Sequence, residues 1–525
     1  MNIMDILVTH GPALLVAIPL LGAFLTPLIS KVNDKVRNLF VICTIGITGI
    51  ILLLVAQQVF DSGPITYVFG SNLNMVQKDT VIRILFEIDA LSIFMAFISI
   101  ILAFAASIYS WGFLGKETGQ DKYYTLLLLM TTGMLGMVLT GDLFNFFVFI
   151  EITSIASAAL IAFWTNKVKA VEAGFKYIFV STIGALFILF ALALLYGQYD
   201  ALNIAKLADN ITFSYLDKIA LILFISALAM KGGIVPMHMW LPDAYGRAPA
   251  SVSLVLVGAT QASLYGVFRV LFTLYGNVIT LPQISFGWIL ILLGLLTMLV
   301  GVIMAMIQTE FKRLIAYGAV AELGYMFLGV GTGLTIIANP DVALSAAPFA
   351  FEAMKGGIFH IINDALDVGL LFMVAGAVYY ATKETSLNNL GGLARNMKYT
   401  TIFFIIGLFA ISGLPPMNGF ASKLLIYEST YQLNPILSII AILSSIMLLA
   451  VFVKIFQSVF LGPKMKKFEH VTEAPKSMLL AMGIIAAIII FFGLFPDLII
   501  THLVEPAANA LIHPEQYLQW LTGGI

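Results

Sequence analysis

The sequence predicts an all-α polytopic membrane protein with about fourteen transmembrane helices. Hydrophobic residues make up 60% of the 525-residue chain and charged residues only 10%, whereas soluble proteins carry about 25% charged residues. Apolar segments of about 20 residues, the length that crosses a bilayer, recur along the whole chain. No intervening stretch is long or polar enough for a soluble domain, so residues 1–525 are expected to form a single transmembrane domain.

The apolar segments follow one another with short connections. The N-terminal stretch before Ala13 has no basic residues and no small-residue cleavage site, so a first span is expected there rather than a signal peptide. The expected spans lie near residues 13–30, 39–60, 88–113, 123–140, 143–163, 173–196, 219–238, 252–275, 286–307, 314–336, 349–380, 400–427, 435–461 and 478–503.

Lysine and arginine residues predict how the chain is oriented in the plasma membrane. Each loop takes the number of the span that it follows. Of the 27 Lys and Arg residues, the even-numbered loops hold only Lys78, Arg83, Lys206 and Lys218, and most of the others lie in odd-numbered loops. Because cytoplasmic loops are enriched in these residues, the odd-numbered loops are expected to be cytoplasmic and both termini outside.

Two expected spans contain helix-breaking residues beside a lysine. KGGIVP, which begins at Lys231, interrupts the 219–238 span, and GLPPMNGFASK, which ends at Lys423, interrupts the 400–427 span. Proline removes a backbone donor and clashes with the preceding turn. Broken helices at matching positions in two halves of a transporter indicate an ion site between repeats.

The two interrupted spans lie five spans apart in the expected order, which predicts two five-helix repeats in inverted orientation. Residues 121–275 would form the first repeat and 276–462 the second. Residues 1–120 would supply the first three helices, and 463–525 the last helix and the C-terminal tail.

Ionisable side chains stand near the middle of several expected spans. A charge at the bilayer centre costs about 2.5–3.5 kcal/mol even on insertion scales, so each such residue is a candidate for proton or ion translocation. Arg269, Glu352, Lys355 and Lys454 lie nearer to span ends, from which long side chains reach the interface. The central candidates are Glu151, Lys176, Lys231, Glu322, His360, Asp364, Asp367 and Lys423.

Glu151 and Lys231 are expected to form a pair, with their charged groups within about 4–6 Å of each other. Opposite charges keep each other ionised, whereas removal from water favours the neutral forms. Separating the two would therefore make Glu151 take up a proton, and bringing Lys231 back would release it. The alternative is a static ion pair that fixes helix packing.

His360, Asp364 and Asp367 are spaced i, i+4, i+7 and so share one helical face. This face would serve as a proton wire or as a hard-cation site with oxygen ligands, and a wet structural face is an equally good interpretation. Glu322 is either an element of the wire or a satisfied interior acid. His238 is expected to cap the broken helix rather than to bind a ligand.

Composition excludes several other classes of protein. The net charge of −1 provides no basic surface for a nucleic acid. The one cysteine, Cys43, can hold neither an iron–sulfur cluster nor an internal disulfide. No cofactor or metal is expected in this chain, and any redox chemistry would belong to a partner. A quinone-reducing enzyme is therefore the weakest of the functions considered.

Several longer motifs occur near the candidate residues: DLFNFFVFIE, KGGIVPMHMWLPDAYGRAPASVS, FKRLIAYGAVAELGY, IFHIIN, GLARNMKYT and GLPPMNGFASK. Together they resemble the antiporter-like subunits of complex I, of Mrp-type cation/proton antiporters and of membrane-bound hydrogenases and related reductases. The resemblance extends from about the 88–113 span to the 478–503 span. It implies the shorter, fourteen-helix type of subunit, which lacks a long C-terminal lateral helix.

The resemblance also implies roles for individual residues. Glu151 and Lys231 match the coupling pair of the family, and His360 matches its first histidine in the 349–380 span. Lys423 matches the residue that exchanges protons with the far side of the membrane.

Two departures from the family pattern lie between these positions. Gln261 stands four residues before Tyr265, where the family usually has a lysine, and Asp364 and Val368 stand where it often has a histidine and a lysine. Glutamine can hold a water chain but cannot store a charge. Where the family has a series of basic residues for proton transfer, this chain has fewer bases and an additional acid. The departures therefore bear on which ion the chain carries.

The resemblance implies an ion-translocating subunit of a larger complex I-related respiratory complex, such as a membrane-bound hydrogenase or reductase. Its partners would be other membrane subunits, and its ion a proton, with sodium as the alternative. Two further functions stay open, namely an Mrp-type Na+/H+ antiporter subunit and a structural spacer that has lost pumping.

Overall fold

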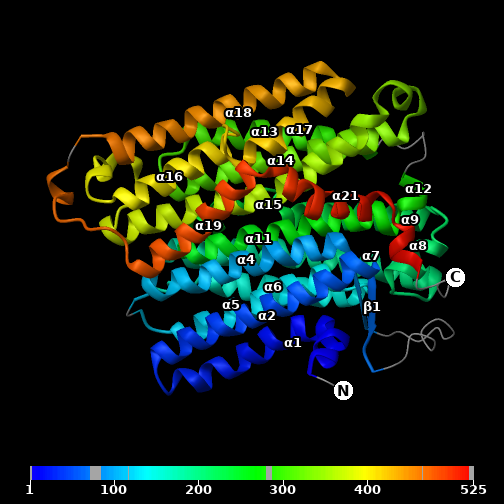
Figure 1. Ribbon diagram of the computed structural model, residues 1–525, viewed down its shortest axis with the longest axis horizontal. Coiled ribbons are helices and arrows are strands. Elements are labelled where there is room, and N and C mark those ends of the chain that lie inside the picture. Colours follow the sequence, from blue (N-terminus) through cyan, green and yellow to red (C-terminus); the bar gives the residue numbers. More distant parts are fainter. Residues whose placement is uncertain (1–2, 71–83, 116, 280–285, 464, 520–525) are drawn as a thin grey trace.

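Long helices lie side by side along the molecule in the computed structural model, which describes residues 3–70, 84–115, 117–279, 286–463 and 465–519 (Figure 1). Twelve of the described helices are long and apolar enough to cross a membrane. They are α1 (Ile3–Ser30), α2 (Asp34–Ser62), α4 (Ala90–Phe113), α5 (Gln120–Leu139), α6 (Leu143–Ile161), α7 (Val168–Tyr199), α11 (Ala250–Phe268, continued by a π-helical turn), α13 (Phe286–Ile307), α14 (Phe311–Ala338), α15 (Pro340–Thr382), α18 (Pro435–Ile455, also continued by a π-helical turn) and α19 (Lys476–Leu494).

The two other expected spans are those with breakers, and the predicted interruptions are present. In the first, α9 (Tyr215–Gly232) is separated from the short α10 (Leu241–Arg247). In the second, α16 (Lys398–Ile411) is separated from α17 (Asn418–Leu433). Because the interruptions leave pieces that are short or carry several charges, neither span is among the twelve.

The protein supplies partners for backbone carbonyls that the interruptions set free. Gly233, with φ 77°, ends α9, and the Trp240 indole donates a hydrogen bond of 2.8 Å to the Met230 carbonyl. At the second interruption Lys423 Nζ donates to the Ile411 carbonyl at 2.7 Å. The carbonyls therefore face protein, as backbone inside a bilayer requires.

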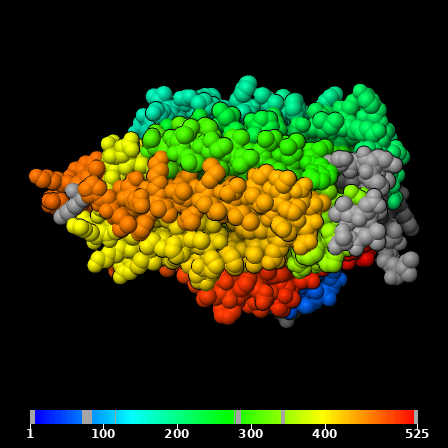
Figure 2. Space-filling model, turned by 90° about the horizontal axis from the view of Figure 1, so that it is seen from above, coloured from blue at the N-terminus to red at the C-terminus, as the bar shows by residue number. Residues whose placement is uncertain are grey.

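The helices differ in how much of their surface is exposed. The most apolar stretches of α11 and α15 are completely buried, and that of α14 is 94% buried. By contrast, α18 runs along one face of the molecule (Figure 2, orange) and leaves Ile436, Ile439, Leu443 and Ile446 more than half exposed. Bulky apolar side chains on this outer face suit contact with lipid. The buried helices α11, α14 and α15 form the interior of the bundle.

Small residues let α13 and α14 approach each other closely. A Cβ atom built on Gly294 would lie 2.7 Å from the Gly324 carbonyl oxygen, and one built on Gly301 would lie 2.5 Å from the Ala321 nitrogen. Such glycine contacts are a common way to pack helices in membranes, where burial of apolar surface provides little driving force. This packing holds α14, which carries Glu322, against the outer helix.

A β-hairpin and several short helices complete the described chain. The hairpin pairs β1 with β2 in antiparallel register, Ile65 opposite Ile88. It follows α2, and no sequence pattern predicted it. The shorter elements are β1 (Ile65–Val68), β2 (Leu85–Ile88), α8 (Ile204–Asn210), α12 (Gly276–Ile279), α20 (Pro496–Ile499), α21 (Glu505–Ile512) and α22 (Glu515–Leu518).

The glycine contact between α13 and α14 gives a test of the packing. Gly294→Ala would push a methyl group into the α14 backbone, which cannot move aside as a flexible side chain can, so unfolding free energy should fall by about 1–3 kcal/mol. Thermal denaturation of the purified protein measures this. Gly197→Ala is the matched control, because nothing lies within 4 Å of its added Cβ. Equal stability of the two variants would contradict the close packing.

Candidate ion-translocation site

Glu151 is held in place by α6, whose first turn is capped by a buried acid. The side chain of Asp142 accepts a hydrogen bond from the Asn145 amide at 2.8 Å, the usual role of aspartate before a helix. Burial raises the pKa of Asp142 to about 6. The helix that starts here carries Glu151 more than two turns further along, facing α9.

Glu151 and Lys231 lie together, as predicted. Lys231 Nζ is 3.6 Å from Glu151 Oε1, and the Lys231 side chain is only 4% exposed. The ammonium also donates a hydrogen bond of 2.8 Å to Ser154 Oγ, one turn from Glu151 on α6. Because Glu151 Oε1 accepts no hydrogen bond from any described residue, Lys231 is bound more closely to Ser154 than to its counter-ion.

A small cavity of about 10 Å³ adjoins the Lys231 side chain on the side facing α11. Ser154, Tyr177, Thr260 and Ser263 contribute hydroxyl groups to its wall. A cavity of this size with several polar neighbours has room for about one water molecule. The polar path therefore continues from Lys231 towards α11.

A second pair of buried glutamate and lysine lies on the other side of the bundle. Lys423 Nζ is 2.8 Å from Glu322 Oε1, and His360 Nε2 is 2.8 Å from Glu322 Oε2. All three side chains are about 1% exposed. Each of these residues is a candidate from the sequence, but no sequence pattern indicated that they contact one another. In both pairs the lysine stands beside a helix interruption.

Gln261 and the two aspartates of α15 lie between the pairs. Gln261 Nε2 donates to Asp364 Oδ2 at 2.9 Å, and Asn418 Nδ2 donates to Asp367 Oδ1 at 3.0 Å. All four side chains are buried. The sequence predicts that Asp364 or Asp367 faces the interior beside His360, with water or a cation between it and α11 and α17. Both aspartates face the interior, and their contacts with these helices are direct.

This middle region contains more acceptor oxygens than donors. Gln261 Oε1, Asp364 Oδ1 and Asn418 Oδ1 are buried and accept no hydrogen bond from the described residues. Leaving a buried acceptor unpaired costs about 1–3 kcal/mol, and water or an ion usually satisfies such groups. These unpaired oxygens suit a cation or a molecule that donates hydrogen bonds.

Two sequence-predicted residues lie outside this series. Lys176 has a side chain that is 49% exposed and lies 3.0 Å from Asp243 of α10, so it is not a central charge. Lys176 also lies 2.7 Å from Glu172, so it belongs to an exposed group of charges on α7 and α10. His238 has an unpartnered Nδ1 within the described chain, and Trp240 rather than His238 is the N-cap of α10. His238 is therefore not the N-cap of α10.

Arg269 was expected to reach towards the membrane surface, and this is also wrong. Its guanidinium is buried and donates two hydrogen bonds, of 2.8 and 2.7 Å, to the two oxygens of Asp89. The Tyr517 ring lies 4.5 Å from the guanidinium. A bidentate pair is the geometry that arginine favours when buried, but positions 180 residues apart in sequence gave no signal of contact.

The comparisons with known proteins agree with this geometry. Residues 140–449 match the family described as NADH:quinone oxidoreductase/Mrp antiporter, TM. This stretch contains both glutamate–lysine pairs and both interruptions. The chain belongs to this family. The resemblance predicted from the motifs is thereby confirmed, and the protein is a multi-pass membrane protein of the antiporter-like kind.

Relatives within the family fall in two groups. In the first, an Na(+)/H(+) antiporter protein of Alkalihalophilus pseudofirmus is 31% identical to this chain. The match covers 81% of this chain but only 54% of that protein, so this chain spans about half of its length. A shorter Na(+)/H(+) antiporter protein of Bacillus subtilis is 28% identical, and the match covers 96% of this chain and 97% of that protein. In the second group, an NADH-quinone oxidoreductase protein of Desulforudis audaxviator is 30% identical over 77% of this chain and 80% of its own length.

Solved structures share the fold over nearly the whole chain. A chain of the Mrp complex from Dietzia sp. superposes with a TM-score of 0.83 at 23% identity, covering 98% of this chain and 99% of that one. A chain of the membrane-bound sulfane sulfur reductase, an archaeal respiratory membrane complex, superposes with a TM-score of 0.82 at 26% identity, covering 97% and 99%.

Removing one member of the Glu322–Lys423 pair should destabilise the protein. Lys423→Met leaves the Glu322 carboxylate buried with only His360 beside it, and breaking a buried pair costs about 3–5 kcal/mol. The double variant Glu322→Gln/Lys423→Met should recover part of this loss, because no unpaired charge remains. Chemical denaturation of the purified protein measures both values.

Lys176→Met is the control for this experiment, since an exposed pair contributes about 0–1 kcal/mol. If Lys423→Met were no more destabilising than Lys176→Met, the Glu322–Lys423 contact would not be a buried ion pair.

Proposed function

We propose that this chain conducts protons across the membrane as the antiporter-like subunit of a larger membrane complex. One observation carries the proposal: each of two glutamate–lysine pairs places a buried lysine beside a break in its helix. A broken helix can change shape locally at low cost, so a small backbone movement there changes the distance between the charges of a pair.

The first pair is already close to such a separation. Lys231 is hydrogen-bonded to Ser154 at 2.8 Å and stands 3.6 Å from Glu151. A short movement of the ammonium into the adjoining cavity would leave Glu151 without its counter-ion, and the carboxylate would then take up a proton. Return of Lys231 would expel that proton. The pair thus acts as a device that loads and unloads one proton per cycle.

The polar residues between the pairs would relay the change. Thr260 and Ser263 share the small cavity with Lys231, and Gln261 on the same helix contacts Asp364. One turn before Asp364 on α15, His360 lies 2.8 Å from Glu322. Gln261 cannot hold a proton, so water and Asp364 would carry it across the middle of the bundle.

Finer features of the fold belong to the same proposal. If α9–α10 and α16–α17 each cross the membrane once, the chain has fourteen spans. Residues 121–275 and 276–462 would then be inverted five-helix repeats, with 1–120 and 463–525 at either end. The matching places of the two interruptions, each beside a buried lysine, support this organisation.

The surroundings of the protein in the membrane follow from its charges and relatives. The excess of Lys and Arg in the odd-numbered loops favours their placement in the cytoplasm, with both termini outside the plasma membrane. The relatives and structural neighbours are subunits of Na(+)/H(+) antiporters and of respiratory complexes. Other membrane subunits are therefore the proposed partners, in a complex I-related reductase or hydrogenase or, as the alternative, in an Mrp-type antiporter.

Glu151→Gln should abolish proton movement. The amide has nearly the same shape as the carboxyl group but cannot exchange a proton, so transport should fall about tenfold or more. The complex is reconstituted into vesicles that contain a proton-sensitive dye. Glu172→Gln, at an exposed pair with Lys176, is the control and should leave transport unchanged.

Unchanged transport in Glu151→Gln would favour the remaining alternative, a structural spacer that keeps the fold but has lost pumping. Equal losses in Glu151→Gln and Glu172→Gln would also count against the assigned role of Glu151.

A specific observation favours sodium as a second candidate ion. The unpaired oxygens of Gln261, Asp364 and Asn418 are the hard oxygen donors that sodium, like other hard cations, prefers. In this alternative the middle region would hold the cation while the two outer pairs move protons in exchange.

Asp364→Asn separates the two ions. It removes the charge that would balance sodium and should lower sodium movement about tenfold or more, with a smaller effect on protons. Sodium- and proton-sensitive dyes in the same vesicles report both fluxes. Asp497→Asn on α20, an exposed residue, is the control. Sodium flux that is absent in wild type, or unaffected by Asp364→Asn, would leave the proton as the ion.

A further inference from the structure

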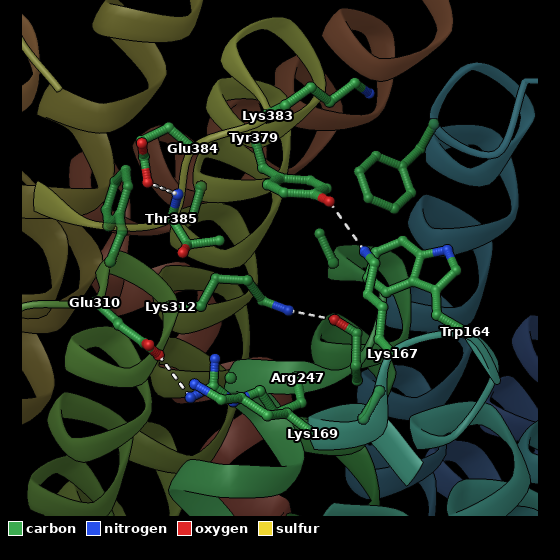
Figure 3. A pocket seen from close by; sticks show the side chains of 18 of the residues that line it. Trp164, Lys167, Lys169, Arg247, Glu310, Lys312, Tyr379, Lys383, Glu384 and Thr385 are labelled. Atoms are coloured by element: carbon green, nitrogen blue, oxygen red, sulfur yellow. Dashed lines mark hydrogen bonds and ion pairs between the residues drawn. The ribbon is translucent and has the colours of Figure 1, made fainter. Parts of the chain in front are cut away.

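A cavity of about 420 Å³ lies between several helices and is lined by other residues than the two glutamate–lysine pairs (Figure 3). Its wall is built from segments far apart in the sequence: the connection between α6 and α7, the end of α10, the start of α14 and the end of α15. These segments lie in or next to the odd-numbered loops, which are predicted to be cytoplasmic. None of the residues assigned above to ion translocation lines it.

Basic side chains outnumber acidic ones around this cavity. The bases are Lys167, Lys169, Arg247, Lys312 and Lys383, and the acids are Glu310 and Glu384.

Both acids already have partners. Glu310 lies 2.9 Å from Arg247. Glu384 accepts hydrogen bonds from the amides of Thr385 and Ser386 and lies 3.6 Å from Lys467. Neither acid therefore pairs with Lys167 or Lys312 in the described part of the chain.

Two of these lysines each donate one hydrogen bond within the described chain. Lys167 Nζ donates a hydrogen bond of 2.9 Å to the Tyr379 hydroxyl and lies 3.4 Å from the centre of the Trp164 ring. Lys312 Nζ donates to the Ala248 carbonyl. An ammonium has three N–H donors, and among the described residues each of the two donates one hydrogen bond. Donors on both therefore remain for an acceptor in the cavity.

The close-up shows how these groups are arranged. Lys312 extends between Arg247 and the segment that carries Trp164 and Lys167, whereas the ammonium of Lys383 is turned away from them (Figure 3). Lys167, Arg247 and Lys312 thus surround one part of the cavity. Guanidinium and ammonium groups together are the usual partners of phosphate oxygens.

Another part of the wall is apolar and includes Phe113, Val168, Ala170 and Ala375. Val168 is 80% exposed and lies at the beginning of α7, so the cavity reaches the outer surface of the bundle. A basic patch beside an apolar wall between helices is the form of site that accepts the head group of an anionic lipid.

We propose that this cavity binds a phosphate-bearing anion, with the phosphate between Lys167, Arg247 and Lys312. The source is either the head group of an anionic lipid, whose glycerol and acyl chains would contact the apolar wall, or free phosphate. Because Arg247 ends α10 and Lys312 begins α14, the anion would connect the short helix after the first interruption to the interior of the bundle.

Calorimetric titration of the purified full-length chain in detergent tests the proposal. The probes are dioctanoyl phosphatidylglycerol, dioctanoyl phosphatidylcholine and inorganic phosphate. Phosphatidylglycerol should bind more tightly than phosphatidylcholine, and Lys167→Gln/Lys312→Gln should weaken it about tenfold or more. Lys398→Gln, an exposed lysine at the start of α16 on the same predicted side of the membrane, is the control and should bind as wild type does.

The comparison of probes identifies the source. Tighter binding of phosphatidylglycerol than of phosphate supports a lipid head group, whereas equal binding of the two, both lost in the double variant, supports free phosphate. Lys167→Arg/Lys312→Arg keeps the charge and should retain binding, which separates loss of the site from loss of the fold. Equal binding of the two lipids, no anion binding by wild type, or unchanged binding in the glutamine variant would overturn the proposal. Each result is independent of ion transport.

Discussion

Charge buried inside an apolar bundle is the constraint on which the rest of this structure depends. Moving a lysine or a carboxylate out of water costs several kcal/mol per ion unless a partner and further hydrogen bonds compensate. The bundle meets this requirement with partners from different helices: α6 with α9, and α14 with α15 and α17. Each contact therefore fixes how helices lie against one another as well as where the charges stand.

The helix interruptions create a similar requirement for the backbone, whose polar groups also need partners inside the membrane. Breaking a helix inside a membrane frees carbonyls that lipid cannot satisfy. Lys423 resolves both problems at once, because its ammonium contacts the Glu322 carboxylate and the Ile411 carbonyl. At the first interruption the tasks are divided, with Trp240 on the Met230 carbonyl and Lys231 on Ser154 beside Glu151. The glutamate–lysine distance is longer in the Glu151–Lys231 pair than in the Glu322–Lys423 pair, and the first is the pair that we expect to separate.

The sequence predicted a good part of this arrangement, and the reasons for success and failure are physical. Glu151 and Lys231 could be paired because each was the only central charge of its span, and the breaks could be placed because glycine and proline act locally. Lys176 was misplaced because apolar composition does not show which side of a helix is exposed, and its ammonium pairs with Glu172 and Asp243 at the surface. The Arg269–Asp89 contact could not be predicted, since no local pattern records which distant residues meet. The Glu322–Lys423 contact is of the same kind.

The central claim is that Glu151 changes its protonation state while the protein works. Infrared difference spectroscopy of the reconstituted complex, recorded as a proton gradient is imposed, tests it most directly, because a protonated carboxyl group has a stretching band distinct from that of a carboxylate. Our account predicts that such a band appears in the wild type and is absent in Glu151→Gln, while Glu172→Gln retains it. Identical difference spectra for the wild type and Glu151→Gln would contradict the account.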